Sequence, residues 1–171
     1  MPAHAGIALT FPQVLILFRH SLTMPTKTEG KVPYAIPIAF FVVVQLASSA
    51  YLLAMDKYLY TYAIVHWYGL LVFAVIDALL LIVLLARKAA PAAMALAVWS
   101  VIGVIAILGD AASGLALSQF HGTAAEGFDY LFGFGKLDGS VFGTSVAVTV
   151  LLIFQLLNAV TCYLAKRKMH A

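Results

Sequence analysis

Four long, predominantly apolar stretches without Lys or Arg constrain this chain more than any other feature of its sequence. They run over residues 32–55, 59–86, 91–118 and 140–165. Only His66, Asp77 and Asp110 interrupt them with a histidine or an acidic side chain. A bilayer core needs about 20 apolar residues per helix, and only helices satisfy their own backbone groups in hydrocarbon. The sequence therefore predicts an all-α integral membrane protein, a bundle of four transmembrane helices spanning residues 32–168.

The composition excludes several classes of protein. Hydrophobic residues make up 64% of the chain and charged residues 10%, against roughly 45–50% and 25% in soluble domains, so a soluble globular enzyme is excluded. The basic residues form short clusters and no continuous face, which argues against a nucleic-acid partner. The single cysteine, Cys162, excludes an intramolecular disulfide and a CxxC redox pair.

The basic residues also predict the orientation, because Lys and Arg collect on the cytoplasmic side. With both termini cytoplasmic, only Lys57 and Lys136 lie outside, beside a short outer hairpin at Asp56 and a longer outer loop over 119–139. The acids Asp56, Glu126, Asp129 and Asp138 then also lie at the outer surface. The basic residues on the cytoplasmic side are Arg19, Lys27, Lys31, Arg87, Lys88, Lys166, Arg167 and Lys168. The expected location is the cell membrane.

Residues 1–31 form a separate cytoplasmic segment. Its apolar run from Ile7 to Phe18 has 12 residues, too few to span a bilayer. No basic residue precedes the run and Arg19-His20 follow it, so a secretory signal is not expected. Two interpretations stay open, a short interfacial helix and a loosely ordered tail ahead of a second start at Met24.

Two polar side chains are predicted to meet in the outer half of the bundle. An ionisable group in lipid costs a few kcal/mol unless it finds a partner. At about 1.5 Å per residue, His66 and Asp110 each lie roughly 10 Å to the outer side of their span's midpoint. We therefore expect them to be in contact. This pair suits a proton relay or a quinone oxygen, and equally a polar contact that fixes helix register.

A second group of polar residues is predicted deeper in the bundle. Asp77 lies on the same helix face as His66, eleven residues further on. Gln45, Gln155 and Asn158 are at similar depth on the first and fourth spans. Together the four are expected to form an interior hydrogen-bonded layer, worth about 0.6 to 2 kcal/mol for each side chain. The alternative is a proton or cation path through Asp77.

The sequence requires no cofactor. A haem, a metal ion or a quinone is the alternative that its histidines leave open. His66 and His121, just beyond the third span, are the histidines that would hold a single haem or metal ion near the outer surface.

The leading functional hypothesis is a non-catalytic accessory or structural subunit of a larger membrane protein complex, with a respiratory or redox complex as one setting. The first alternative is a small homo-oligomeric proton-coupled transporter or channel that uses Asp77 or the His66–Asp110 pair. The second is a single-haem or quinone-site redox subunit that uses His66. The expected partners are the lipid bilayer and other membrane subunits or further copies of the chain.

Overall fold

The computed structural model describes residues 34–87, 90–113, 123–134 and 142–169. The regular structure in these residues is helical. Its elements are α2 (Ala35–Met55), α3 (Lys57–Tyr62), α4 (Ile64–Arg87), α5 (Ala90–Ser113), α6 (Ala124–Phe132) and α7 (Phe142–Met169). The predicted N-terminal interfacial helix and His121 lie outside the described residues.

Four of these helices, α2, α4, α5 and α7, are long and apolar enough to cross a membrane. This confirms the predicted four-helix bundle. The structure does not test which way the bundle faces, so the cytoplasmic position of both termini stays a prediction. Their β-branched and aromatic residues do not prevent helix formation, because in hydrocarbon the backbone has no other way to satisfy its polar groups.

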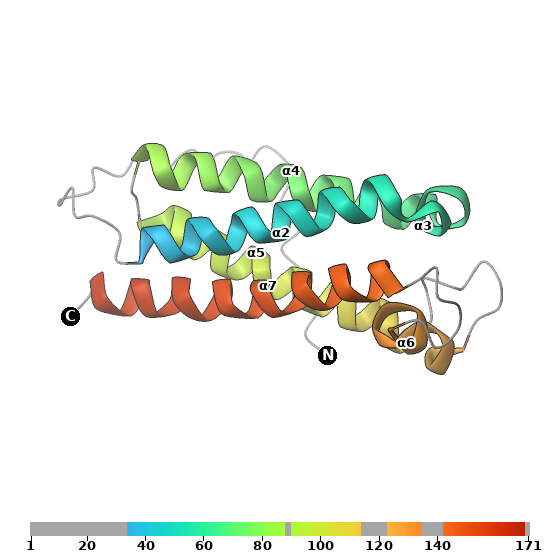
Figure 1. Cartoon of the computed structure of the whole chain (residues 1–171). Helices are drawn as coiled ribbons and strands as arrows, with labels where there is room; N and C mark the ends of the chain where they lie inside the picture. The colour runs from blue at the N-terminus through green and yellow to red at the C-terminus, as the bar shows by residue number, and fades with distance from the viewer. Residues whose placement is uncertain (1–33, 88–89, 114–122, 135–141, 170–171) are drawn as a thin grey trace, which may run out of the picture.

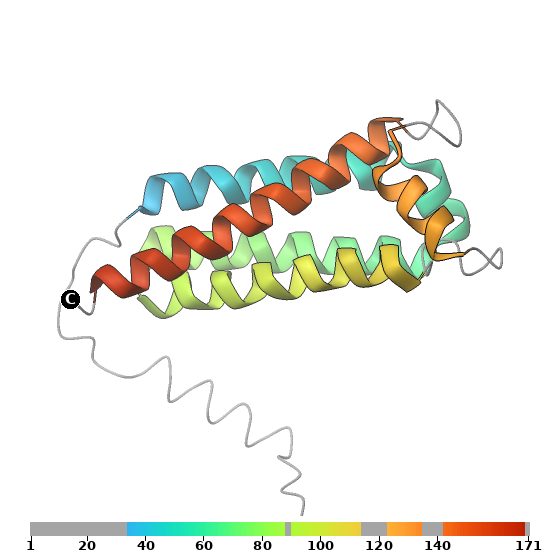
Figure 2. The ribbon, with the colours of Figure 1, turned by 90° about the horizontal axis from the view of Figure 1, so that it is seen from below.

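The four long helices form a closed ring in the order α2, α4, α5, α7, in which each packs against its two neighbours. Viewed from below, α4 and α5 lie along one side and α2 along the other, and α7 runs obliquely across the bundle (Figure 2). The short helices α3 and α6 both lie at one end of the bundle (Figure 1), which we call the capped end. The α2–α7 side and the α4–α5 side are therefore opposite sides of the ring.

The interior contains two apolar clusters. One lies in the half away from the capped end and includes Ile38, Leu84 and Leu96, with exposed fractions of 0%, 1% and 0%. The other lies toward the capped end and includes Leu52 and Leu151, packed with the α6 residues Tyr130 and Leu131. The buried polar residues near the helix midpoints lie between the two clusters.

The capped end differs from the two loops that the sequence predicts there. Instead of a tight hairpin, the chain forms α3 before α4 begins at Ile64, and the predicted loop 119–139 contains α6. Thr123 caps α6, since its hydroxyl accepts a hydrogen bond from the Glu126 N–H at 3.3 Å, and the Glu126 carboxylate accepts one from the Thr123 N–H. These hydrogen bonds from Thr123 lower the pKa of Glu126. Thr-x-x-Glu is the capping-box pattern.

Asp56 corrects the expectation that every acid near the capped end is at the surface, because its side chain is only 8% exposed. One carboxylate oxygen accepts from the Leu59 N–H at 2.9 Å and so caps α3. The other accepts from the Tyr130 hydroxyl at 2.7 Å and from the Thr144 hydroxyl at 2.8 Å. Asp56 therefore ties α3, α6 and α7 together.

Tyr130 is buried at the capped end, with 4% of its surface exposed. Burial, reinforced by the Asp56 carboxylate, raises the pKa of Tyr130 far above its ordinary value, so its hydroxyl keeps the proton that it donates. Phe128 and Phe134, in contrast, are 45% and 49% exposed. Exposed aromatic side chains suit the membrane interface, whereas Tyr130 belongs to the packing of the capped end.

Replacing Asp56 by Ala is expected to destabilise the bundle by about 2–4 kcal/mol, because hydrogen bonds to a charged group contribute about 1.5–3 kcal/mol each and two buried hydroxyls lose their acceptor. The measurement is the midpoint of thermal unfolding in mild detergent. Lys57→Ala, at the adjacent exposed residue, is the matched control. Equal midpoints for the two variants would contradict the role assigned to Asp56.

Candidate functional site

The contact predicted between the second and third spans is present. His66 on α4 has its Nε2 atom 3.7 Å from Oδ1 of Asp110 on α5. The pair lies toward the capped end, two residues after the start of α4 and three before the end of α5. Because α4 and α5 are antiparallel neighbours, these two positions lie at the same level of the bundle. This confirms the contact that their predicted depths in the membrane indicated.

The His66–Asp110 pair is not enclosed by the bundle. The His66 side chain is 24% exposed and the Asp110 side chain 35% exposed. The pair therefore lies at the surface of the ring, in the seam between α4 and α5. This arrangement is unusual for helices that cross a membrane, because ionisable residues there almost always face the bundle interior or a water-filled cavity.

Small residues border the pair on both helices. Gly69 lies one turn beyond His66, and Ala106 one turn before Asp110, on the same helix faces. Both residues are exposed, and a Cβ added at Gly69 would have no atom within 4 Å. The side chains beside the pair are therefore short, so that the backbone of another helix could approach the pair closely.

A second polar region lies at the middle of the bundle. Gln45, the central residue of α2, donates from Nε2 to the backbone oxygen of Phe154 on α7 at 3.0 Å. Asn158 on α7 donates to the Ser100 hydroxyl on α5 at 2.9 Å, and the Cys162 thiol contacts the Asn158 amide oxygen at 3.6 Å. These hydrogen bonds join α7 to both of its neighbours at mid-depth.

The four residues of the predicted layer lie at similar depth, but they do not form one hydrogen-bonded network. They are Gln45, Asp77, Gln155 and Asn158. All four residues are buried, between 0% and 4% exposed. Gln45 bonds to a backbone carbonyl and Asn158 to Ser100 instead. Three buried acceptors, Gln45 Oε1, Asp77 Oδ1 and Gln155 Oε1, have no hydrogen-bond donor among the described residues.

Gln155 packs directly on the backbone of α5. A Cβ placed at Gly103 would collide with the Gln155 amide group, so this glycine is required by the close approach of α5 and α7. The sequence does not single out Gly103, because the need for a glycine depends on which side chain faces it.

The haem or metal site proposed for His66 and His121 stays a prediction, since His121 is not among the described residues. Within the part of the chain that the structure describes, no group of three or more His, Cys, Asp or Glu side chains is placed to hold a metal ion.

Comparisons of the chain with protein-family models, with curated proteins and with solved structures find no match.

Gly103→Ala is expected to destabilise the bundle by about 1–3 kcal/mol, the usual cost of overpacking, because the Gln155 amide has to move. Gly69→Ala is the matched control: its site is open, and the loss of a helical glycine is neutral or stabilising by up to about 1 kcal/mol. Thermal unfolding in detergent measures both. If the two substitutions shift the midpoint equally, Gly103 is not a point of close contact.

Proposed function

We propose that this protein is a non-catalytic subunit of a larger membrane protein complex, and that the seam between α4 and α5 binds another membrane protein. The observation that carries the proposal is the partly exposed His66–Asp110 pair on two helices that are apolar enough to span a bilayer. A pair in this position needs a covering that lipid tails cannot provide.

The energetics favour a protein as that covering. An acidic or basic side chain facing hydrocarbon costs at least a few kcal/mol. The contact between His66 and Asp110 offsets part of this cost, but about a quarter to a third of each side chain is still uncovered. A partner helix that covers the seam removes the contact with lipid and can offer polar groups of its own, which act as interhelical glue in membranes.

The helix that carries His66 is the least covered of the four long helices. In its most apolar window α4 is 17% buried, against 33% for α2 and α5 and 39% for α7. Its exposed residues include Val65, Val72, Val75 and Leu79, all more than half exposed. The helix with the most free surface is therefore the one that carries His66, and exposed small residues lie beside the seam.

This proposal predicts that the double variant His66→Leu/Asp110→Leu loses its partner. After extraction in mild detergent, the amount of co-purifying partner chain should fall about tenfold, which corresponds to about 1.4 kcal/mol of binding free energy. The variant itself should stay in the membrane, because both substitutions replace a polar group by an apolar one.

Thr149→Val is the control for this experiment, since it removes a hydroxyl on α7 that has no hydrogen-bond partner among the described residues and should leave the yield of partner unchanged. The proposal is wrong if the double variant retains its partner at the wild-type level, or if the wild-type protein purifies with no stoichiometric second chain.

Asp77 supports a second candidate function, a proton-coupled transporter or channel. Its side chain is 3% exposed, and Oδ1 has no hydrogen-bond donor among the described residues. The four predicted spans contain no Lys or Arg, so an ionised Asp77 would have no basic counter-ion within them. A buried carboxyl without a counter-ion is a candidate for binding and releasing a proton or a cation.

For this second candidate, the expected result is proton flux into vesicles that contain the purified protein alone, at a rate above that of protein-free vesicles. Asp77→Asn, which keeps the shape of the side chain but cannot exchange a proton, should reduce the flux to the protein-free rate, whereas Asp77→Glu should retain part of it. A pH-sensitive dye inside the vesicles measures the flux. Equal flux for the wild type and Asp77→Asn would rule this function out.

A further inference from the structure

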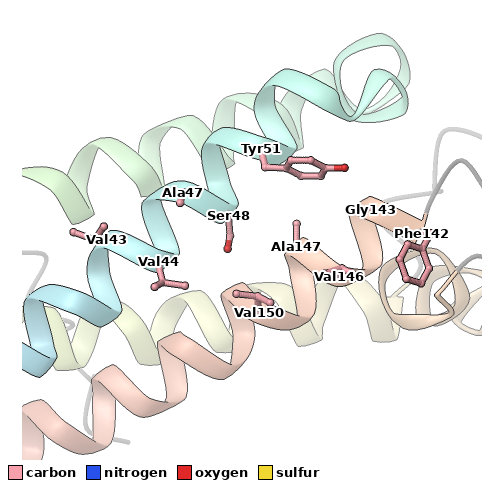
Figure 3. A pocket seen from close by; sticks show the side chains of 10 residues that line it. All are labelled: Val43, Val44, Ala47, Ser48, Tyr51, Phe142, Gly143, Val146, Ala147 and Val150. Atoms are coloured by element: carbon pink, nitrogen blue, oxygen red, sulfur yellow. The ribbon is translucent and has the colours of Figure 1, made fainter.

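An apolar groove runs between α2 and α7 in the half of the bundle nearer the capped end (Figure 3). Its volume is about 590 Å³, and it is open along the side of the bundle. The residues that form its two walls include Val43, Ala47 and Tyr51 from α2 and Gly143, Ala147 and Val150 from α7. In Figure 3 the side chains of Ser48 and Ala147 point into the space between the two helices.

The groove exists because the facing positions are small in its middle and large at its inner end. Ala47 faces this space from α2 and Ala147 from α7. Two helical turns from these alanines, away from the capped end, the Phe40 and Phe154 rings meet edge to face with their centroids 6.0 Å apart. The hydrogen bond from Gln45 to the Phe154 backbone oxygen holds α2 against α7 at the same level. The groove therefore ends near the middle of the bundle.

At the capped end the groove is bounded by an aromatic residue. The Tyr51 hydroxyl lies directly over Gly143, where an added Cβ would collide with it. Tyr51 is 44% exposed, so its ring lies at the rim. A tyrosine ring can lie among acyl chains while its hydroxyl extends toward the membrane interface.

The length of the groove matches one leaflet of a bilayer. Val43 and Tyr51 are eight residues apart, which is about 12 Å along a helix. Half of a hydrocarbon core is about 15 Å. Tyr51 lies six residues, about 9 Å, from the central Gln45, so the groove covers the inner part of one leaflet and ends at the level where the acyl chains of the two leaflets meet.

We propose that this groove binds one acyl chain of a membrane lipid from the leaflet at the capped end, with the headgroup beyond Tyr51 on the capped side. A transmembrane helix of a partner is a poorer fit, because it would have to continue past the Phe40–Phe154 contact to cross the membrane. An acyl chain has the right length, needs no hydrogen bonds and enters from the open side. The site lies across the ring from the α4–α5 seam, so it is independent of the proposed complex.

The test uses the full-length protein in nanodiscs of phosphatidylcholine that contain a small fraction of the same lipid with a diazirine midway along one acyl chain. After illumination, mass spectrometry compares labelling of α2 residues 43–51 with labelling of the exposed α4 residues 65–79. We expect labelling in the groove to exceed that on α4 about tenfold, equivalent to a preference of about 1.4 kcal/mol.

Ala47→Phe fills the groove from an exposed position and should reduce its labelling to the level of α4. Val43→Trp, at a residue that is 54% exposed, provides a second filling variant. Ala86→Phe is the matched control, because it places the same side chain at an exposed alanine on α4, and it should leave labelling of the groove unchanged.

Equal labelling of the groove and α4 in the wild type overturns the proposal, and so does groove labelling that survives both filling variants. A further measurement places a photo-crosslinking amino acid at position 47 and illuminates the protein in native membranes. A lipid adduct there supports the proposal, and a protein adduct overturns it.

Discussion

The structure depends on one constraint of the hydrocarbon environment, in which every polar group needs a partner within the protein. The backbone meets this constraint by forming helices. Several polar side chains meet it by bonding to the backbone of another segment: Gln45 donates to the Phe154 carbonyl, Trp67 to the Leu53 carbonyl at 3.0 Å, and Ser145 to the Tyr130 carbonyl at 3.1 Å. The contacts that satisfy these groups therefore also set the register of the bundle.

Much of the fold follows from the sequence because it depends on length, period and depth. The four long helices come from predominantly apolar stretches without Lys or Arg, and the contact between His66 and Asp110 comes from counting residues along two antiparallel helices. The short helices at the capped end were missed, although local signals for them exist. Thr123 and Glu126 have the spacing of a capping box, and Asp56 stands at the N-cap position of α3.

Other features depend on three-dimensional packing that the sequence does not encode locally. Helical carbonyls are already bonded within their own helix, so nothing near Phe154 indicates that its oxygen accepts a second bond from Gln45. The requirement for glycine at Gly103 depends on Gln155, 52 residues further along. The partial exposure of the His66–Asp110 pair depends on the crossing of α4 and α5. Each of these features needed the relative placement of two helices.

The most direct test of the central claim, that another protein covers the His66–Asp110 pair, is a photo-crosslinking amino acid at Ala106, illuminated in native membranes. The account predicts a crosslinked product of defined, larger mass that contains a different membrane protein. The same amino acid at Val160, an exposed residue of α7 on the far side of the ring, should not give this product. Adducts with lipid alone, or with a second copy of this chain, at position 106 would contradict the account.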